Sequence, residues 1–356
     1  MTAADRVVFF LQGQKVPAAR VRGYLVADAL QKAGVTCDLR VPYPSVYGDT
    51  EIGYPWSKAT RYLLRPVSAA VQATHLRDLS DRDIVFLQRP MVEFPITVLE
   101  RRAARGRRSV FDFDDAIFLG FGNERKVRGI IDAVDHVITG NRYLAEFAGV
   151  PDRTTVIPTV VDADRFTRQP TRDTKGKDVV IGWTGLRGNY PQLMTAAPAL
   201  LRVMKKTGAQ LLLISNGPPP RELTDAGARY VPWAAATEVE DLAAVDIGLM
   251  PLPDTPFTRG KCAFKVIQYM ALGRPAVASP VGVNREVVTD GVDGFLPETE
   301  QGWEDALVSL VEDPALRDRI GTAARTRIEG AYSLAAVLPR YLDVLRGLGL
   351  RTAAAA

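Results

Sequence analysis

Three cations lie close together at the start of an expected helix in the second half of the 356-residue chain. They are Arg259, Lys261 and Lys265, and the helix is expected over residues 264–272. Positive charge at this end opposes the helix dipole, and an anion held by the cations and by the free first-turn amides would remove that conflict. The spacing therefore predicts a phosphate or diphosphate site. The alternative is that Lys265 only extends its stem toward solvent.

The same helix adds further contacts to the expected anion site. Gln268 follows Lys265 along one face of the helix, so its amide is expected beside the same ligand. The residues around the helix start are expected to line the bound group as well: Gly260, Cys262, Ala263 and Phe264.

A glycine-rich segment, residues 182–189, follows an apolar run and precedes a helix expected near residue 190. Glycine lets the backbone approach a ligand closely, and the following helix start offers free amides. The sequence therefore predicts a second phosphate contact, made by Gly182, Thr184, Gly185 and Arg187. A tight strand-to-helix turn without a ligand explains the glycines equally well.

Three carboxylates, Asp112, Asp114 and Asp115, lie at the end of an expected strand in the first half. Burial of carboxylates without a partner is costly, which favours a binding role toward sugar hydroxyls or an acceptor. A magnesium site is one alternative. Capping of a helix by Asp114 or Asp115 is another.

Short apolar runs alternate with helical stretches along the whole chain, and most of the runs lack polar alternation. This pattern predicts an α/β protein with parallel sheets covered on both faces. Residues 161–178 are polar and lack an apolar period, so we expect a linker there. The prediction is two doubly wound, Rossmann-like domains facing a shared cleft, over residues 1–165 and 166–330, with a C-terminal helix over residues 331–356 that crosses back to the first domain.

The composition excludes several classes of protein. The chain is 47% hydrophobic and 24% charged, with 45 basic and 41 acidic residues, which is not the footprint of a nucleic-acid binder. Two cysteines and two histidines predict neither a disulfide framework nor a zinc site. No apolar run suits a membrane span, and no leader is evident, so we expect a cytoplasmic protein. A basic run, residues 101–108, fits a solvated helix end or a patch that contacts the inner face of a membrane.

The anion site also carries a resemblance to a known family. Residues 265–296 read KVIQYMALGRPAVASPVGVNREVVTDGVDGFL, which resembles the donor-site segment of retaining glycosyltransferase family 4 enzymes. Residues 156–166 read VIPTVVDADRF and resemble the family's "V-I-P-N-G-V-D-x-x-x-F" segment. The resemblance implies a GT-B fold and transfer of a sugar from a nucleotide-diphosphate donor to an acceptor hydroxyl by a metal-independent, front-face route. The resemblance also implies that the enzyme needs no cofactor. The implied acceptor is a sugar, a lipid-linked molecule or another small molecule.

The resemblance also implies roles for single residues. Lys261 and Lys265 would stabilise the departing diphosphate, and Asp114 falls where the family commonly has a histidine facing the donor sugar. Trp233 falls in the loop that cradles the nucleotide base, with plain core packing as the alternative. The loop after the first strand would border the acceptor together with the strand-end acids, which makes Gly13, Arg20, Arg22, Asp112 and Asp115 the expected acceptor contacts. A purely structural role for that loop is the alternative.

The chain departs from the family pattern at two acidic positions. Gly260 and Gln268 stand where the family has glutamates that contact the donor sugar and the ribose. The basic pair after the first strand of the second domain is also incomplete, because Arg187 is its only cation. A non-catalytic or hydrolytic sugar-nucleotide-binding protein is therefore the alternative function.

Overall fold

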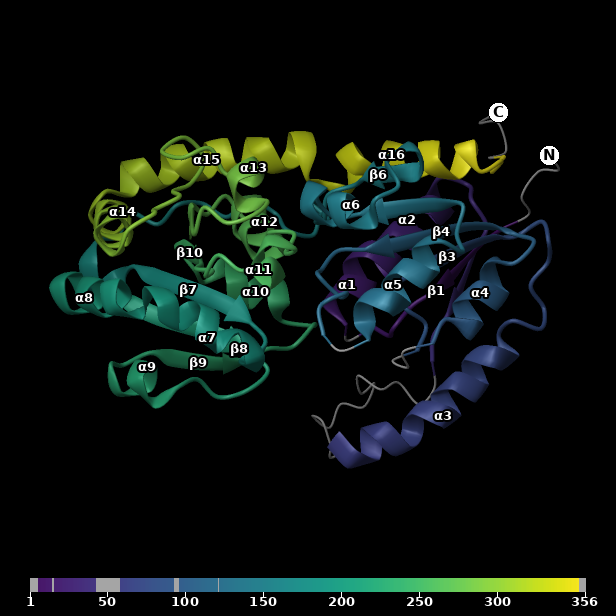
Figure 1. Ribbon diagram of the computed structural model, residues 1–356. Helices are drawn as coiled ribbons and strands as arrows, with labels where there is room; N and C mark the ends of the chain where they lie inside the picture. The colour runs from purple at the N-terminus through teal and green to yellow at the C-terminus, as the bar shows by residue number, and fades with distance from the viewer. Residues whose placement is uncertain (1–5, 15, 43–57, 93–95, 121, 352–356) are drawn as a thin grey trace. The chain divides into compact units, whose positions relative to one another are not determined.

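The computed structural model describes residues 6–14, 16–42, 58–92, 96–120 and 122–351, and the chain forms two compact units. Unit 1 comprises Met1–Thr159 and Val337–Ala356, and unit 2 comprises Val160–Ala336. Each unit is described by itself (Figure 1).

Unit 1 contains a six-stranded parallel sheet in the order β2-β1-β3-β4-β5-β6. The strands are β1 (Val7–Phe10), β2 (Cys37–Arg40), β3 (Ile84–Gln88), β4 (Arg108–Phe113), β5 (His136–Thr139) and β6 (Thr154–Val156). Its helical segments are α1 (Pro17–Ala19), η1 (Arg20–Tyr24), α2 (Leu25–Lys32), α3 (Lys58–Thr74), α4 (Val98–Ala104), α5 (Asn123–Ile131), α6 (Arg142–Ala148) and η2 (Pro151–Arg153). The last helix, α16 (Leu334–Gly347), packs on this unit, with Tyr341 6.4 Å from Phe86 between ring centroids.

Unit 2 contains a five-stranded parallel sheet in the order β11-β10-β7-β8-β9. The strands are β7 (Val180–Gly185), β8 (Gln210–Ser215), β9 (Arg229–Pro232), β10 (Ile247–Met250) and β11 (Ala276–Ala278). The helical segments are η3 (Gly176–Asp178), η4 (Arg187–Asn189), α7 (Tyr190–Leu193), η5 (Met194–Ala196), α8 (Ala197–Thr207), α9 (Arg221–Asp225), α10 (Glu238–Ala243), α11 (Pro256–Arg259), α12 (Phe264–Ala271), α13 (Asn284–Val287), α14 (Glu300–Glu312) and α15 (Pro314–Ala331).

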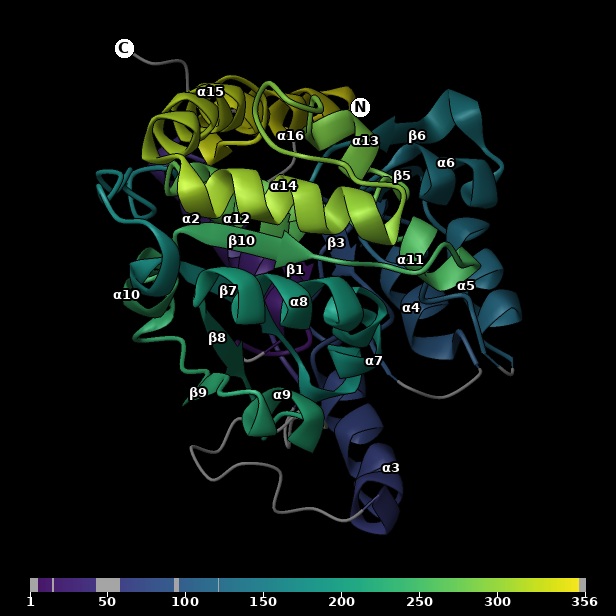
Figure 2. The same cartoon turned by 90° about the vertical axis from the view of Figure 1, so that its left-hand side faces the viewer.

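Two apolar clusters cover the faces of the sheet in unit 2. One joins Leu212 and Met250 to α12 and α15, and the other joins Leu211 and Ile247 to α8 and α14. Figure 2 shows α8 and α14 on the near side of this sheet. Burial on both faces explains why the strands read as continuous apolar runs. The parallel sheets expected from the sequence are confirmed in both units.

The polar segment at residues 161–178 belongs to unit 2, and the expectation of a linker there is wrong. Arginine side chains hold its backbone: Arg325 donates to the Ala163 carbonyl at 3.0 Å, and the buried Arg317 donates to the Arg172 carbonyl at 3.1 Å. Arg274 donates to the Pro170 carbonyl at 3.1 Å. The polar composition of the segment suggested a linker because no apolar period was present. The segment is nevertheless held in place, because arginine side chains distant in sequence donate hydrogen bonds to its carbonyls.

Strand order determines where each sheet reverses. In unit 2 the chain runs from β7 to β8 and β9 on one side and then returns to β10 and β11 on the other. The reversal lies between β7 and β10, and in unit 1 it lies between β1 and β3. Ligands of doubly wound sheets bind beyond the carboxyl ends of the strands at such a reversal.

One close approach holds the carboxyl edge of unit 2 together. A Cβ at Gly248 in β10 would lie 2.1 Å from the ring of Tyr269, so only glycine leaves room for that ring. The Tyr269 hydroxyl accepts a hydrogen bond from the Thr184 amide of β7 at 2.9 Å. Tyr269 therefore joins α12 to the central strand.

We expect Gly248→Ala to lower the free energy of unfolding by about 1–3 kcal/mol because the methyl group overpacks the Tyr269 ring. Gly330→Ala is the matched control, since nothing lies within 4 Å of its Cβ position in α15 and the change should add about 0.5–1 kcal/mol. Guanidinium unfolding followed by circular dichroism measures both. If the two variants were equally stable, the close packing of the Tyr269 ring against Gly248 would be contradicted.

Candidate functional site

The two central strands of unit 2 separate at their carboxyl ends. Pairing between β7 and β10 stops at Gly182 and Gly248, and beyond that point the Thr184 amide bonds to Tyr269 rather than to a strand. The pairing ends at the reversal of strand order, and α11 and then α12 follow β10 along the chain.

Gly182 and Gly185, two glycines of the expected phosphate-binding segment, lie inside strand β7 rather than in a loop after it. A Cβ at Gly182 would lie 2.2 Å from the Val245 side chain, so this glycine serves packing. A Cβ at Gly185 would lie 2.9 Å from the Lys265 ammonium nitrogen. The absence of a side chain at Gly185 thus leaves room for Lys265 at the end of the strand. The Thr184 amide is already hydrogen-bonded to the Tyr269 hydroxyl.

The amino end of α12 has donors without acceptors. The helix begins after Ala263, which is buried and has φ of 53°, and no side chain caps the first turn. Within the described residues, no group accepts from the amides of Phe264, Lys265 or Val266. A left-handed residue other than glycine costs about 1–2 kcal/mol, a strain that often accompanies function.

The ammonium of Lys265 stands over an aromatic ring instead of a carboxylate. Its Nζ lies 4.5 Å from the ring centroid of Trp183, and the described part of the chain gives it no ion pair or hydrogen bond. Burial, and then the nearby Lys261 ammonium, lower the pKa of Lys265 to about 7. The reading of Lys265 as a solvated side chain therefore fails, because its charge is partly desolvated beside another cation.

Gln268 adds a buried donor to the same helix. Its side chain is 2% exposed, and its Nε2 has no acceptor among the residues that the structure describes. An unpaired buried polar group costs about 1–3 kcal/mol, which a ligand acceptor would recover. Trp183 Nε1 in β7 and Ser215 Oγ at the end of β8 are also buried without a hydrogen-bond partner among the described residues.

The third expected cation, Arg259, is neutralised. It is the last residue of α11, and its guanidinium donates to both oxygens of Asp254 at 2.6 and 2.9 Å. Lys261 Nζ lies 4.4 Å from the ring centroid of Phe257. Of the three cations expected from the sequence, Arg259 therefore has its charge balanced by a carboxylate.

The other expected donor contacts lie around the same edge. Arg187 is exposed after β7, where its amide donates to Asn216 Oδ1 at 2.7 Å and no carboxylate of the described chain pairs with its side chain. Gly260 and Cys262 are both buried between α11 and α12. Trp233 follows β9, and its indole donates to the buried Glu238 at 3.3 Å. Trp233 packs partly on the core, so both roles expected for it remain compatible.

In unit 1, two of the expected acceptor contacts are buried against each other. Arg22 Nε and Nη2 donate to the Asp112 carboxylate at 2.8 and 2.6 Å, and the two residues are 1% and 0% exposed. Arg22 also donates to the Ile157 carbonyl at 2.9 Å. This geometry corrects the sequence expectation, because a fully buried bidentate pair presents no surface to an acceptor.

Asp114 and Asp115 face a cation that the sequence analysis missed. Arg89 Nη2 lies 2.7 Å from Asp114 and 3.9 Å from Asp115, and Arg89 itself has φ of 65°. Burial opposes ionisation of Asp114, but Arg89 and then Arg22 lower its pKa below the ordinary value. Arg89 directly follows β3, at the reversal of strand order. Its position just after an expected strand is the sequence feature from which a role in the site could have been predicted.

The loop after β1 contains the remaining expected acceptor contacts. Gly13 has φ of 112°, and the chain then enters a continuous helical segment with a π-helical turn over Arg20–Tyr24. Such turns frequently occur at functional sites. Here the turn carries both Arg20, which is partly exposed, and the buried Arg22.

Neither histidine is placed for catalysis. Burial lowers the pKa of His75 and of His136, and His136 Nε2 lies 2.9 Å from Thr155 Oγ1. Among the described residues, no group of three or more His, Cys, Asp or Glu side chains is arranged to hold a metal. In the same residues, no helix has the length and apolar character needed to cross a bilayer.

Residues 179–313 match the family model described as "Glycosyl transferases group 1". The chain is 30% identical over 173 residues to D-inositol 3-phosphate glycosyltransferase of Streptosporangium roseum, covering 44% of this chain and 38% of that protein. It is 25% identical over 251 residues to GDP-mannose-dependent monoacylated alpha-(1-6)-phosphatidylinositol monomannoside mannosyltransferase of Corynebacterium glutamicum, covering 62% and 64%. The aligned regions thus span about two fifths to two thirds of these relatives.

Solved structures resemble the whole chain. Anabaena Alr3699/HepE in complex with UDP-glucose superimposes with a TM-score of 0.70 at 15% identity, covering 96% of this chain and 99% of that one. Sucrose-phosphate synthase from Thermosynechococcus elongatus gives a TM-score of 0.70 at 14% identity, covering 97% and 99%. This likeness confirms the fold expected from the sequence, two Rossmann-like domains of the GT-B class.

The unaccepted donors of α12 predict binding of an anion in unit 2. Inorganic pyrophosphate should bind, and Lys265→Gln should weaken it about 10- to 100-fold, because a charged hydrogen bond contributes about 1.5–3 kcal/mol. Lys205→Gln, at an exposed lysine of α8, is the matched control. Calorimetric titration measures the affinities, and equal affinity of wild type and Lys265→Gln would contradict the site.

The lowered pKa of Lys265 predicts a pH dependence of the same binding. The anion needs the ammonium form, which is lost as pH rises above about 7, so binding should take up a proton and weaken by up to about tenfold per pH unit. Pyrophosphate also titrates in this range, and the pH dependence of its binding to Lys265→Gln measures that contribution by itself. The affinity of the wild type for pyrophosphate should fall more steeply between pH 7 and 9 than the affinity of Lys265→Gln. Parallel affinity profiles for the two proteins would contradict the titration of Lys265.

Proposed function

We propose that the protein transfers a sugar, with retention of anomeric configuration, from a nucleotide-diphosphate donor to an acceptor hydroxyl. One observation carries the proposal: the first-turn amides of α12 and the Lys265 ammonium have no described acceptor, and they lie in the segment that matches the family model. A diphosphate bound there supplies the missing acceptors.

The chemical step follows from where charge develops. When the bond between sugar and diphosphate breaks, negative charge grows on the leaving phosphate. Fixed ammonium groups of Lys261 and Lys265 and the α12 amides then stabilise the transition state more than the ground state. In the front-face route, the leaving phosphate oxygen accepts the proton of the attacking hydroxyl, so the new bond forms on the face that the diphosphate leaves.

The position of Lys265 supports the view that it takes the place of the second cation of the basic pair expected after β7. The strand β7 has tryptophan at residue 183 and only Arg187 beyond its end. Lys265 reaches over that tryptophan and against Gly185, so a cation from α12 occupies the end of β7. The proposal is that Lys265 takes the place of the cation missing from the basic pair after β7.

The donor-binding residues divide according to the part of the donor that each contacts. Gln268 is assigned to the ribose, where its amide can both donate and accept. Trp233 is assigned to the base and Asp114 to the donor sugar. Gly260 has no side chain for that sugar, so the backbone at Gly260 and Cys262 lines it instead. Gly13, Arg20 and Asp115 are assigned to the acceptor.

The proposal includes no cofactor and no catalytic metal, because the lysines supply the charge that a divalent cation would otherwise provide. Full transfer in the presence of a chelator is the expected result. The relatives are named for inositol phosphate and phosphatidylinositol substrates, and a structural neighbour holds UDP-glucose. They support a polyol or lipid-linked acceptor and a uridine or guanosine donor. A cytoplasmic location is part of the proposal.

The proposed leaving-group role is tested by Lys261→Ala and Lys265→Ala, measured as transfer from a panel of nucleotide sugars to inositol and sugar acceptors. Loss of one donor to a developing charge should lower the rate about 100- to 1000-fold. Lys205→Ala serves as the control for loss of a surface lysine. Undiminished transfer by both site variants would refute the role.

The same assay separates the competing functions. Retention predicts that nuclear magnetic resonance of the first product shows the anomeric configuration of the donor. Prompt nucleotide release without an acceptor would instead show a hydrolase. Nucleotide binding without turnover toward any acceptor would show a binding protein, which is the outcome that the missing acid at Gly260 motivates.

A further inference from the structure

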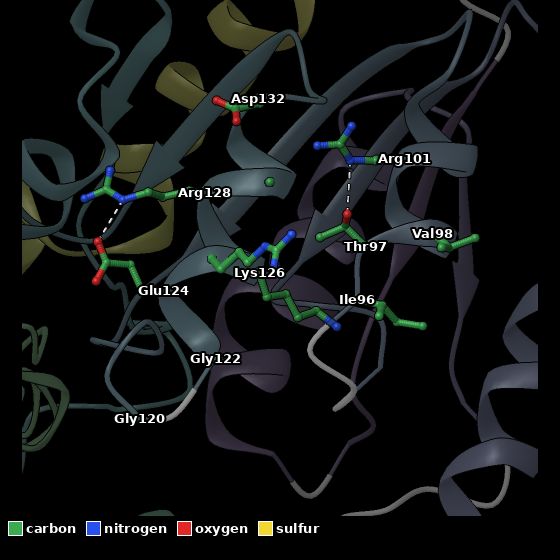
Figure 3. A pocket seen from close by; sticks show the side chains of 12 residues that line it. Ile96, Thr97, Val98, Arg101, Gly120, Gly122, Glu124, Lys126, Arg128 and Asp132 are labelled. Carbon is green, nitrogen blue, oxygen red and sulfur yellow. Dashed lines mark hydrogen bonds and ion pairs between the residues drawn. The ribbon is translucent and has the colours of Figure 1, made fainter.

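Unit 1 contains a cavity. It has a volume of about 1000 Å³ and lies between the first turn of α4 and the length of α5. Figure 3 shows Ile96, Thr97, Val98 and Arg101 on one side and the α5 side chains on the other. Arg101 belongs to the basic run at residues 101–108, and the other lining residues have no role assigned from the sequence or the comparisons.

Two guanidinium groups in this cavity have no carboxylate partner among the described residues. Arg101 donates through Nε to Thr97 Oγ1 at 3.0 Å and forms no ion pair, and Arg125 is exposed without an ion pair. Gly129 leaves room beside Arg101, because a Cβ there would lie 3.6 Å from Arg101 Nη2 and 3.3 Å from Thr97 Cγ2.

The other charges of the cavity are largely satisfied internally. Arg128 pairs with Glu124 at 2.9 Å, and the buried Lys126 pairs with the buried Glu100 at 3.2 Å. Asp132 is exposed at the carboxyl end of α5 and partly offsets the positive charge. The balance leaves Arg101 and Arg125 available to an anion.

The entrance is apolar. Ile96 is 55% exposed and Val98 is 63% exposed, and Leu119, beside the lining residue Gly120, is 38% exposed. Exposed apolar side chains that lie together often mark a binding surface, and the two arginines add a preference for an anion. A bare phosphate would satisfy only the arginines, whereas a phosphate that carries an apolar chain would satisfy both.

We propose that the α4–α5 cavity binds a phosphate ester carrying an apolar chain, with the phosphate between Arg101 and Arg125 and the chain against Ile96 and Val98. Arginine suits the phosphate because its planar donors match two oxygens at once. The site is separate from the diphosphate site of unit 2, so each can fail without the other.

The test measures binding of water-soluble dihexanoyl phosphatidylglycerol, below its micelle concentration, to the full chain by calorimetry. Wild type should bind it at least about tenfold more tightly than inorganic phosphate and more tightly than dihexanoyl phosphatidylcholine, because the chain and the net negative charge both contribute. Arg101→Gln with Arg125→Gln should weaken binding about tenfold or more, and Ile96→Ser with Val98→Ser should remove the advantage over phosphate.

Two controls keep the result interpretable. Arg319→Gln, at an exposed arginine of α15 in unit 2, should leave the affinity unchanged. Pyrophosphate binding by the double arginine variant should also equal that of wild type, which shows that unit 2 is unaffected, and an unchanged circular dichroism spectrum shows that unit 1 remains folded. Asp132→Asn should strengthen binding of the lipid by removing the opposing charge.

Vesicle flotation distinguishes the source of the ligand. Binding to vesicles of phosphatidylcholine and phosphatidylglycerol, but not of phosphatidylcholine alone, would assign the site to a membrane lipid. Binding of the soluble ester alone would assign it to a soluble amphiphile. The proposal is overturned if the wild type binds neither, if the arginine variant binds as tightly as wild type, or if phosphate alone binds as tightly as the ester.

Discussion

The site in unit 2 depends on one uncompensated charge, the ammonium of Lys265 held 4.5 Å above the ring of Trp183. A lysine in this position is destabilised by burial and by Lys261, and in the described chain nothing anionic relieves it. Protein charges are rarely left in this condition unless a ligand completes them. The three unaccepted amides at the start of α12 have the same requirement, so a single anion would satisfy both.

The surrounding structure is arranged to keep that position open. Gly248 admits the Tyr269 ring, Tyr269 holds the end of β7, and Gly185 leaves room for the Lys265 ammonium. Arg259, the other nearby cation, is neutralised by Asp254 and adds no repulsion. The cost of the arrangement is visible in the left-handed backbone of Ala263 and in the unpaired amide of Gln268.

Much of this could be predicted from the sequence because local pattern determines it. Strands buried on both faces read as unbroken apolar runs, and cations beside a helix start conflict with its dipole whatever the tertiary fold. The failures all concern partners distant in sequence. Asp112 lies 90 positions from Arg22, and Asp114 lies 25 from Arg89, so neither pair is visible as a motif. Residues 161–178 looked like a linker because the arginines that hold them come from α12–α15.

A crystal structure of the protein with UDP tests the central claim most directly. The account predicts the β-phosphate within about 3 Å of Lys265 Nζ and of the first-turn amides of α12, the range of charge-assisted hydrogen bonds. A diphosphate bound elsewhere, with Lys265 still over Trp183 and those amides unaccepted, would contradict it.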